Sequence, residues 1–251
     1  MTATRPIAII TGASRGIGAA TAKRLAFDGY DICVNFRADG EAAGNVVREV
    51  EQLGRRAIAV QADVATEAGV MGLFDAVDKG LGTLTALVNN AGVLDRQCRV
   101  TELTEARINR ILHTNVTGTL LCCREAVKRM STKSGGSGGG IVNVSSAAAR
   151  IGSANEWVDY AASKGAVDTL TKGLANEVGG EGIRVNAVRP GIIHTTMHAD
   201  GGMPDRVDQL GPTMPMGRGG YPEEVAAAIA WLLSDQSSYT TGGFVEVSGG
   251  R

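Results

Sequence analysis

The chain alternates short apolar runs, rich in β-branched residues, with longer segments that repeat apolar residues at helical spacing. In the first such segment Ile17, Thr21 and Leu25 recur every four residues, as on one face of a helix. Strands that alternate with helices predict βαβ units, and therefore a parallel sheet with helices on both faces. The expected strands span residues 7–11, 31–36, 57–61, 84–89, 140–145 and 183–188.

The remaining elements continue this pattern to the end of the sequence. The two longest expected helices span residues 104–130 and 158–178. A last helix is expected to begin at Pro222, because proline suits the first turn of a helix and two glutamates follow it. It leads to a seventh strand near residues 243–247. Length alone allows one or two domains, but a single series of βαβ units without an internal repeat predicts one α/β domain over residues 1–251, with a doubly wound parallel sheet.

Composition and charge exclude several other classes of protein. Glycine makes up 35 of the 251 residues, about twice the average usage, but without the period of collagen. With 43% hydrophobic and 20% charged residues, the chain is expected to be globular rather than disordered. The 25 basic and 26 acidic residues give no field that would attract nucleic acid or an anionic membrane. No signal peptide and no run of about 18 apolar residues is present, so a cytoplasmic location is expected.

Neither the cysteines nor the histidines have the spacing of a metal site. Cys122 and Cys123 are adjacent and are expected to pack as small hydrophobic residues in a helix. His194 and His198 are four residues apart, but no third ligand cluster accompanies them, so no metal is expected. No CxxC pair occurs among the four cysteines, Cys33, Cys98, Cys122 and Cys123.

A glycine-rich sequence, TGASRGIG, follows the first expected strand at residues 11–18. Open parallel sheets bind ligands beyond the carboxyl ends of their strands. Glycines at this position would permit a tight turn and let the backbone approach a pyrophosphate at a helix N-terminus. A plain strand-to-helix turn is the alternative. The expected dinucleotide-binding residues of this loop are Gly12, Ser14, Arg15, Gly16, Ile17 and Gly18.

Arg37 follows the second strand, where an NAD-binding protein of this kind would carry an acidic residue for the ribose 2′-hydroxyl. Arg37 and Arg15 could instead clamp a 2′-phosphate, which favours NADP over NAD as the cofactor. Two solvated arginines are the alternative. Small or polar residues that suit adenine and ribose contacts follow the third and fourth strands: Asp63, Val64, Asn90, Ala91 and Gly92.

Ser146 follows the fifth strand, and Tyr160 and Lys164 lie beyond it on the expected helix 158–178. A tyrosine and a lysine four residues apart share one face of a helix. For a phenol to act as acid or base near pH 7, its pKa must fall from about 10, and a neighbouring ammonium or an oxidised nicotinamide would lower it. Taken alone, Tyr160 and Lys164 could also be a surface pair.

Two segments lack the pattern of a strand or a helix. Residues 131–140, STKSGGSGGG, are expected to form a flexible loop. Residues 190–222 hold five of the six prolines and four of the seven methionines, so residues 194–220 are expected to form a mobile, partly apolar lid over the substrate. The alternative is a surface loop that covers part of the core.

Six motifs, in this order, resemble the short-chain dehydrogenase/reductase family across the whole chain. They are TGASRGIG at 11–18, NNAG at 89–92, Asn115 in NVTG, Ser146 in NVSS, YAASK at 160–164 and RPG at 189–191. The resemblance implies a seven-stranded Rossmann sheet in the order 3-2-1-4-5-6-7, assembled as a homotetramer or a homodimer. Within the family, the chain looks similar to glucose-dehydrogenase-like and 3-oxoacyl-carrier-protein-reductase-like members.

The same resemblance implies roles for individual residues. Tyr160 would be the general acid or base, and Ser146 would hold the reacting oxygen by a hydrogen bond. Lys164 would bind the nicotinamide ribose and lower the pKa of Tyr160, and Asn115 would hold a water of the proton relay. The interval from Ser146 to Tyr160 is one residue longer than is common in the family, which puts residues 155–157 beside the substrate. The expected nicotinamide contacts after the sixth strand are Pro190, Gly191, Ile193 and Thr195.

Together these residues favour an NADP(H)-dependent oxidoreductase that transfers a hydride between the cofactor and a small carbonyl or secondary alcohol substrate. A non-catalytic dinucleotide sensor or scaffold is the main alternative, because a fold does not determine an activity. A sugar-nucleotide epimerase would also use a tyrosine and a lysine. The complete set of Asn115, Ser146, Tyr160 and Lys164 argues against a pure binding protein, and the short chain leaves little room for an epimerase's substrate domain.

Overall fold

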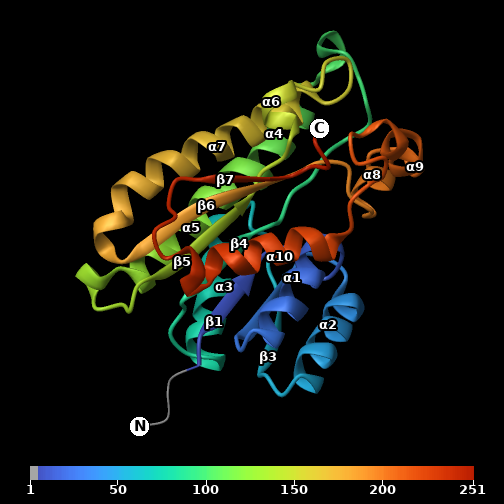
Figure 1. The fold of residues 1–251 in the computed structure, drawn as a ribbon. Coiled ribbons are helices and arrows are strands. Elements are labelled where there is room, and N and C mark those ends of the chain that lie inside the picture. Colours follow the sequence, from blue (N-terminus) through green and yellow to red (C-terminus); the bar gives the residue numbers. More distant parts are fainter. Residues whose placement is uncertain (1–4) are drawn as a thin grey trace.

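The computed structural model describes residues 5–251. Seven parallel strands form one sheet in the order β3-β2-β1-β4-β5-β6-β7 (Figure 1). The expected doubly wound sheet and its strand order are therefore confirmed. The strands are β1 (Ile7–Ile10), β2 (Asp31–Phe36), β3 (Ala57–Gln61), β4 (Ala86–Asn89), β5 (Gly139–Val144), β6 (Ile183–Pro190) and β7 (Phe244–Val247).

Helices cover both faces of the sheet (Figure 1). Because successive residues of a strand point to opposite faces, Ile10 packs in one hydrophobic cluster and Ile9 in the other. One cluster lies under α1 (Gly16–Phe27), α2 (Gly40–Gln52) and α10 (Pro222–Leu233), and the other under α3 (Glu67–Gly80), α5 (Gly118–Met130) and α7 (Val158–Val178). The shorter helices are α4 (Glu105–Leu112), α6 (Ala148–Ile151), α8 (Met197–Asp200) and α9 (Arg206–Leu210).

The sheet changes its winding direction between β1 and β4. Strand β1 pairs with β2 on one side and with β4 on the other. The chain moves outward from β1 to β3 in one direction and from β4 to β7 in the opposite direction. In such sheets the ligand crevice lies beyond the carboxyl ends of the strands at this reversal, and the loops after β1 and β4 therefore frame it.

Most element boundaries agree with the sequence patterns. Strands 31–36 and 57–61, helix 158–178 and the helix that begins at Pro222 are confirmed. The ends of the other strands differ from the expected ones by one or two residues, which is the usual uncertainty of element ends.

The expected continuous helix 104–130 is interrupted. A π-helical segment, His113–Thr117, joins α4 to α5. At Gly118, directly after it, a Cβ atom would lie 2.8 Å from the carbonyl oxygen of Val64, so only glycine allows this approach. Thr119 Oγ1 donates a hydrogen bond to the Asn115 carbonyl (2.8 Å). The wider turn brings Asn115 into the core, and π-helical turns frequently occur at functional sites.

Residues 131–138 form a tight turn and residues 139–140 begin β5, where the sequence predicts a flexible loop over 131–140. A 3₁₀ turn, Thr132–Ser134, is followed by a backbone hydrogen bond from Gly136 N to Ser131 O (2.9 Å). A Cβ atom on Gly136 would lie 2.4 Å from the carbonyl oxygen of Arg129, and one on Gly139 would lie 2.1 Å from that of Thr85. These glycines are required by close backbone packing, which composition alone does not reveal.

Residues 194–220 contain short helices where the sequence predicts irregular chain. They hold α8, α9 and a 3₁₀ turn, Gly211–Thr213. The two ends of the segment are joined, because His194 N donates to Gly220 O (2.9 Å) and Gly220 N donates to Ile192 O (2.8 Å). In Figure 1 this segment lies beyond the carboxyl ends of the central strands, where it can border a ligand crevice.

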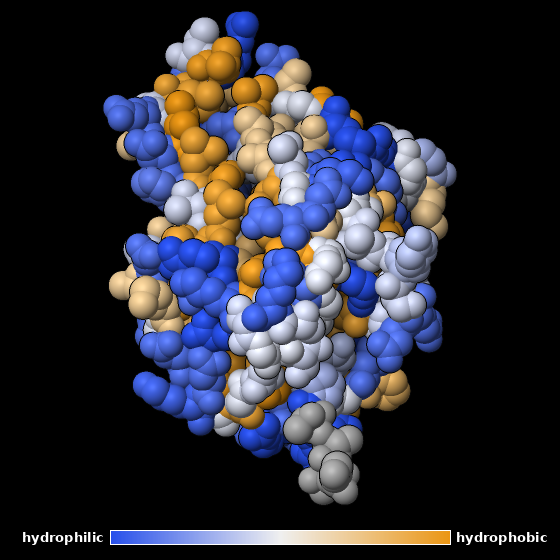
Figure 2. Space-filling view, turned by 90° about the vertical axis from the view of Figure 1, so that its left-hand side faces the viewer, coloured by the Kyte–Doolittle hydropathy of each residue, from blue (hydrophilic) through white to orange (hydrophobic). Residues whose placement is uncertain are grey.

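The surface is mixed in polarity. Figure 2 shows the face that lies on the left in Figure 1, where hydrophobic residues form a band between hydrophilic ones. Exposed apolar side chains on α4, α5 and α7 include Leu112, Leu120 and Val158. Over residues 5–251, no helix has both the length and the apolar character needed to cross a membrane.

Candidate active site

The loop between β1 and α1 has a backbone shape that depends on glycine. Gly12 and Gly16 have positive φ angles of 61° and 56°, a region that favours glycine. At Gly18, a Cβ atom would lie 2.5 Å from the carbonyl oxygen of Gly12. Helix α1 has no acidic residue in its first turn and no side-chain cap. Its N-terminal N–H groups therefore suit an anion such as a phosphate.

Side chains from neighbouring strands fix this loop. Asn90, after β4, donates from Nδ2 to the carbonyls of Thr11 (2.9 Å) and Gly12 (3.0 Å). Asn35, in β2, accepts from Gly12 N (3.2 Å) and donates to Ala62 O (3.1 Å). These bonds link the loops after β1, β3 and β4, in part through Asn35 of β2. The sequence analysis did not single out Asn35, although an asparagine within a mostly apolar strand segment was visible in the sequence, and the structure shows that it is buried.

A cleft of about 670 Å³ lies over this loop. Asp39, which also borders it, is the N-cap of α2 and accepts a hydrogen bond from Ala42 N (2.9 Å). The cleft walls include most of the expected dinucleotide-binding residues: Gly12, Ser14, Arg15, Gly16, Ile17, Arg37, Asp63, Val64, Asn90, Ala91, Gly92 and Thr195. Gly18 lies behind the wall, where its missing side chain makes room for Gly12 and Asn90.

The two arginines of the expected 2′-phosphate clamp border the same cleft but differ in their partners. Arg37 is exposed, and within residues 5–251 no carboxylate lies within 4.0 Å of its guanidinium. Arg15 forms an ion pair with Asp200 at the end of α8, with Nη2 and Oδ2 2.5 Å apart. In this structure Arg15 therefore links the glycine loop to segment 194–220, a contact that the sequence did not predict.

A second cavity, of about 110 Å³, adjoins the cleft and is lined by three of the four expected catalytic side chains. Ile17, Asn90, Leu94, Thr195 and Met197 border both cavities. Its walls also include Ser146, Tyr160, Lys164, Pro190, Gly191 and Ile193. The structure thus brings the expected serine, tyrosine and lysine together beside the glycine-loop cleft.

Tyr160 and Lys164 occupy one face of α7, one helical turn apart. The Lys164 Nζ donates to the carbonyl of Val144 (2.8 Å) and lies 5.6 Å from the centre of the Tyr160 ring. Burial lowers the pKa of Lys164 to about 8. Burial also raises the pKa of Tyr160 to about 12, although the Ser146 hydroxyl acts in the opposite direction. The protein's own groups therefore do not produce the lowered phenol pKa that the sequence predicts.

Ser146 is better placed for chemistry than its neighbour Ser145. Ser145 is buried, and its Oγ donates to the carbonyl of Lys164 (3.3 Å), so it fixes α7 against β5. Ser146 is only half-buried, and its Oγ accepts from Ala148 N (3.1 Å). This bond leaves the Ser146 hydroxyl proton free to be donated to another acceptor.

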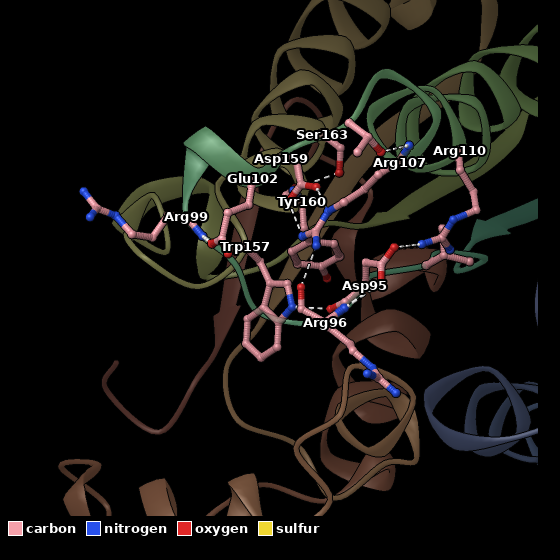
Figure 3. Close-up of polar contacts among 12 residues, drawn as sticks. Asp95, Arg96, Arg99, Glu102, Arg107, Arg110, Trp157, Asp159, Tyr160 and Ser163 are labelled. Carbon is pink, nitrogen blue, oxygen red and sulfur yellow. Dashed lines mark hydrogen bonds and ion pairs between the residues drawn. The ribbon is translucent and has the colours of Figure 1, made fainter.

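An arginine fixes the start of α7 (Figure 3). Arg107, from α4, forms two hydrogen bonds to the Asp159 carboxylate (2.6 and 3.2 Å) and one to the carbonyl of Arg96 (2.6 Å). Asp159 in turn accepts from the backbone N–H of Tyr160 (2.9 Å). Both members of the Arg107–Asp159 pair are largely buried. Together these bonds fix the position of Tyr160 relative to the loop after β4.

Asn115 is fully buried, and its side chain has protein partners at both ends. Its Oδ1 accepts from Val93 N (2.8 Å), and its Nδ2 donates to Val93 O (3.0 Å) and Ser163 Oγ (3.0 Å). It lies near Lys164, because a Cβ on Gly92 would be 3.5 Å from both Asn115 Oδ1 and Lys164 Nζ. The amide joins the loop after β4 to α7 and does not itself border the cavity.

Of residues 155–157, which the long Ser146–Tyr160 interval places beside the substrate, Trp157 lines the cavity, and Asn155 and Glu156 do not; Ser153 lines it as well. Ser153 and Asn155 have positive φ angles of 48° and 60°.

His194 stacks on Tyr221 instead of facing His198, and the centres of the His194 and Tyr221 rings are 4.8 Å apart. Residues 5–251 contain no group of three His, Cys, Asp or Glu side chains arranged to hold a metal ion.

Comparison with known proteins relates the whole chain to oxidoreductases. A family model described as enoyl-(acyl carrier protein) reductase matches residues 12–251. The chain is 58% identical over 245 residues to the uncharacterized oxidoreductase YgfF of Escherichia coli, which covers 98% of this chain and 99% of that protein. It is 36% identical over 243 residues to glucose 1-dehydrogenase 2 of Bacillus subtilis, with 97% and 93% covered.

Solved structures agree with these relationships. A crystal structure of a short-chain dehydrogenase from Burkholderia cenocepacia in complex with NADP matches with a TM-score of 0.88 and 36% sequence identity. The match covers 98% of this chain and 97% of that chain. At this identity and coverage, the likeness extends to the family as well as to the fold.

Proposed function

The chain belongs to the short-chain dehydrogenase/reductase family of oxidoreductases, and from that premise we propose that it interconverts a carbonyl compound and a secondary alcohol with NADP(H). The observation that carries the proposal is the placement of Ser146, Tyr160 and Lys164 on one cavity that adjoins the glycine-loop cleft. We further propose that residues 1–251 act as one Rossmann domain, with residues 194–220 as a lid.

The glycine-loop cleft fits a dinucleotide. Two features of the β1–α1 loop suit a pyrophosphate. The backbone is so closely packed at Gly18 that a Cβ atom there would clash, and the first turn of α1 has no acidic residue. The guanidinium of Arg37 is exposed and forms no ion pair with the described part of the chain, which supports a 2′-phosphate and thus NADP over NAD. Asp63 and Val64 would border the adenosine half, and Gly191, Ile193 and Thr195 the nicotinamide half.

The proposed hydride transfer at the cavity would use only a few side chains of this protein. The bound cofactor supplies or accepts the hydride. During reduction Tyr160 would donate its phenolic proton to the carbonyl oxygen, and during oxidation it would remove the alcohol proton. Ser146 would donate a hydrogen bond to the same oxygen and stabilise its developing charge. Lys164, held by Val144, would bind the ribose, and Asn115 would fix the loop that carries Gly92.

Assembly as a homotetramer or homodimer is part of the proposal. The exposed Leu112, Leu120 and Val158 on the helices α4, α5 and α7 support association through these helices. Light scattering coupled to size exclusion should give a mass of two or four chains. A single-chain mass at micromolar concentration would contradict this part of the proposal.

A screen of NADPH oxidation tests the proposed activity. The purified protein would be offered ketones, diketones, 3-oxoacyl thioesters and ketoses, and the matching alcohols with NADP⁺. Turnover of at least one carbonyl class, absent from heat-denatured protein, is expected. Tight NADPH binding without turnover of any class would favour the alternative, a dinucleotide-sensing protein.

A further inference from the structure

The cavity that holds Tyr160 is lined by more basic side chains than carbonyl reduction requires. Besides Lys164, its walls include Arg206 from α9, Arg251 after β7, and His198 from α8. None of these three was needed for the proposed hydride transfer. Cationic and polar groups that converge on a small-molecule cavity fix the orientation and the chemical class of its ligand.

Arg206 is already neutralised by the protein. Its guanidinium forms two hydrogen bonds to the Glu156 carboxylate (2.9 and 2.7 Å) and stacks on the Trp157 ring, 4.5 Å from its centre. Gln97 Nε2 also donates to Glu156 (3.2 Å). With only 5% of its side chain exposed, Arg206 fixes the loop 152–157 against α9 and has little capacity left for a ligand.

Arg251 has no such partner. Within the described residues, no carboxylate lies within 4.0 Å of its guanidinium. Its backbone is nevertheless fixed, because Arg150 Nη2 donates to the main-chain oxygen of Arg251 (2.8 Å) and Arg251 N donates to Ser248 O (3.2 Å). Burial and the nearby Arg206 lower the pKa of Arg251, yet a guanidinium remains charged at neutral pH. The half-buried guanidinium of Arg251 therefore forms no ion pair within the described residues, although the more distant Glu156 carboxylate attracts it.

His198 offers a second polar group without a partner. Its Nδ1 is buried and makes no hydrogen bond to any residue that the structure describes, which is rare for a buried polar atom in a native protein. Burial, Arg206 and Arg251 together lower the pKa of His198 to about 4, so the imidazole is neutral at pH 7 and one ring nitrogen can donate. A ligand atom that accepts hydrogen bonds would satisfy both His198 and Arg251.

The geometry points to a substrate that carries a carboxylate, bound by Arg251 and His198, with its reacting carbonyl at Tyr160 and Ser146. This inference rests on the proposed function and narrows it to small oxo acids and the corresponding hydroxy acids. The cavity volume of about 110 Å³ favours a compact acid over a large thioester, since pockets for drug-sized ligands have several times that volume.

Oxo acids and their methyl esters test the inference directly. NADPH-dependent reduction of 4-oxopentanoate and 5-oxohexanoate would be compared with that of the two methyl esters, in the unaltered protein and in Arg251→Met, Arg251→Lys and Arg48→Met. Arg48 is exposed on α2, so its replacement removes one charge away from the cavity. Thermal unfolding would verify that each variant is folded.

For at least one acid, we expect kcat/KM to exceed that of its ester by about 10-fold or more, since a charge-assisted hydrogen bond contributes about 10- to 100-fold. Arg251→Met should remove this preference while ester reduction changes less than about 3-fold. Arg251→Lys should retain part of the preference, and Arg48→Met all of it. Equal rates for acid and ester, or a preference that survives in Arg251→Met, would overturn the inference while the proposed activity stands.

A binding measurement separates this inference from the activity itself. Calorimetry would compare pentanoate with pentanamide, which has the same chain without the charge. Binding of pentanoate alone, lost in Arg251→Met, would support the anion site even if no carbonyl were reduced. Equal binding of both compounds, or binding of neither, would contradict the site.

Discussion

The Lys164 ammonium lies 5.6 Å from the centre of the Tyr160 ring, one turn farther along α7, and its Nζ is held by the carbonyl of Val144. Despite this neighbour, burial raises the pKa of Tyr160 to about 12. Alcohol oxidation requires a lower pKa for Tyr160, and the positive charge of an oxidised nicotinamide would therefore have to lower it. The two directions of the proposed reaction should consequently depend on pH differently.

Carbonyl reduction needs the protonated phenol, and a phenol pKa of about 12 keeps Tyr160 protonated. We expect kcat/KM for reduction to stay nearly constant from about pH 6 to about pH 9, whereas kcat/KM for oxidation rises with pH over the same range. Initial rates in both directions with one substrate pair would measure this. A reduction rate that falls through pH 7 would contradict the raised pKa.

Lys164 should reduce the stability of the folded protein at neutral pH. Its pKa falls from 10.5 to about 8 in the folded chain, so the unfolded chain binds more protons between these values and stability rises with pH across that window. Lys164→Met should raise the free energy of unfolding at pH 7 by up to about 3 kcal/mol and remove this pH dependence. Urea unfolding at pH 7 and pH 10 measures both effects. Replacing the exposed Lys79 by Met is the control, and an equal response of the two variants would contradict the prediction.

Arg37 should determine the choice between NADP and NAD. Arg37→Asp removes a cation for the 2′-phosphate and adds a carboxylate that suits a ribose hydroxyl. The ratio of kcat/KM for NADPH to that for NADH should fall by at least about 10- to 100-fold. Arg48→Asp, which makes the same charge change on the exposed side of α2, should leave the ratio within about 3-fold. An unchanged ratio in Arg37→Asp would remove Arg37 from the proposed clamp.

Gly18 should tolerate no side chain, since a Cβ there would lie 2.5 Å from the Gly12 carbonyl oxygen and 2.6 Å from Asn90 Nδ2. Gly18→Ala is expected to distort the loop, raise the Kd for NADPH by more than about 10-fold and destabilise the fold by about 1–3 kcal/mol. Gly72, in α3, has open space around its position, so Gly72→Ala should be neutral or stabilising. Fluorescence titration with NADPH and thermal unfolding test the pair. Wild-type NADPH affinity in Gly18→Ala would contradict the close approach.

Local sequence patterns were sufficient to predict a parallel sheet with helices on both faces and the loops at its carboxyl edge, whereas the strand order was implied by the family resemblance. Strand alternation and the glycine loop depend on neighbouring residues, so their signals are visible without a structure. The π-helical segment around Asn115 was not predictable in this way, because it depends on the approach of Gly118 to the distant Val64 carbonyl.

The unexpected contacts join residues that are far apart in the chain. Arg15 and Asp200 form an ion pair across 185 positions, and Arg206 and Glu156 across 50. Arg251 reaches the cavity from the chain beyond β7. No periodicity or spacing marks such residues, so only the folded structure shows that Arg206 and Arg251 line the cavity.

The measurement that tests the proposed mechanism most directly is the comparison of turnover and NADPH binding in Tyr160→Phe, a change that removes one hydroxyl group. Because the cavity shape and the cleft over the glycine loop are retained, the Kd for NADPH should stay within about 3-fold. The kcat should fall by about 10²- to 10⁴-fold, as expected for the loss of a general acid or base. A Tyr160→Phe protein that keeps more than about a tenth of the wild-type kcat would contradict the role of Tyr160 as the proton donor and acceptor.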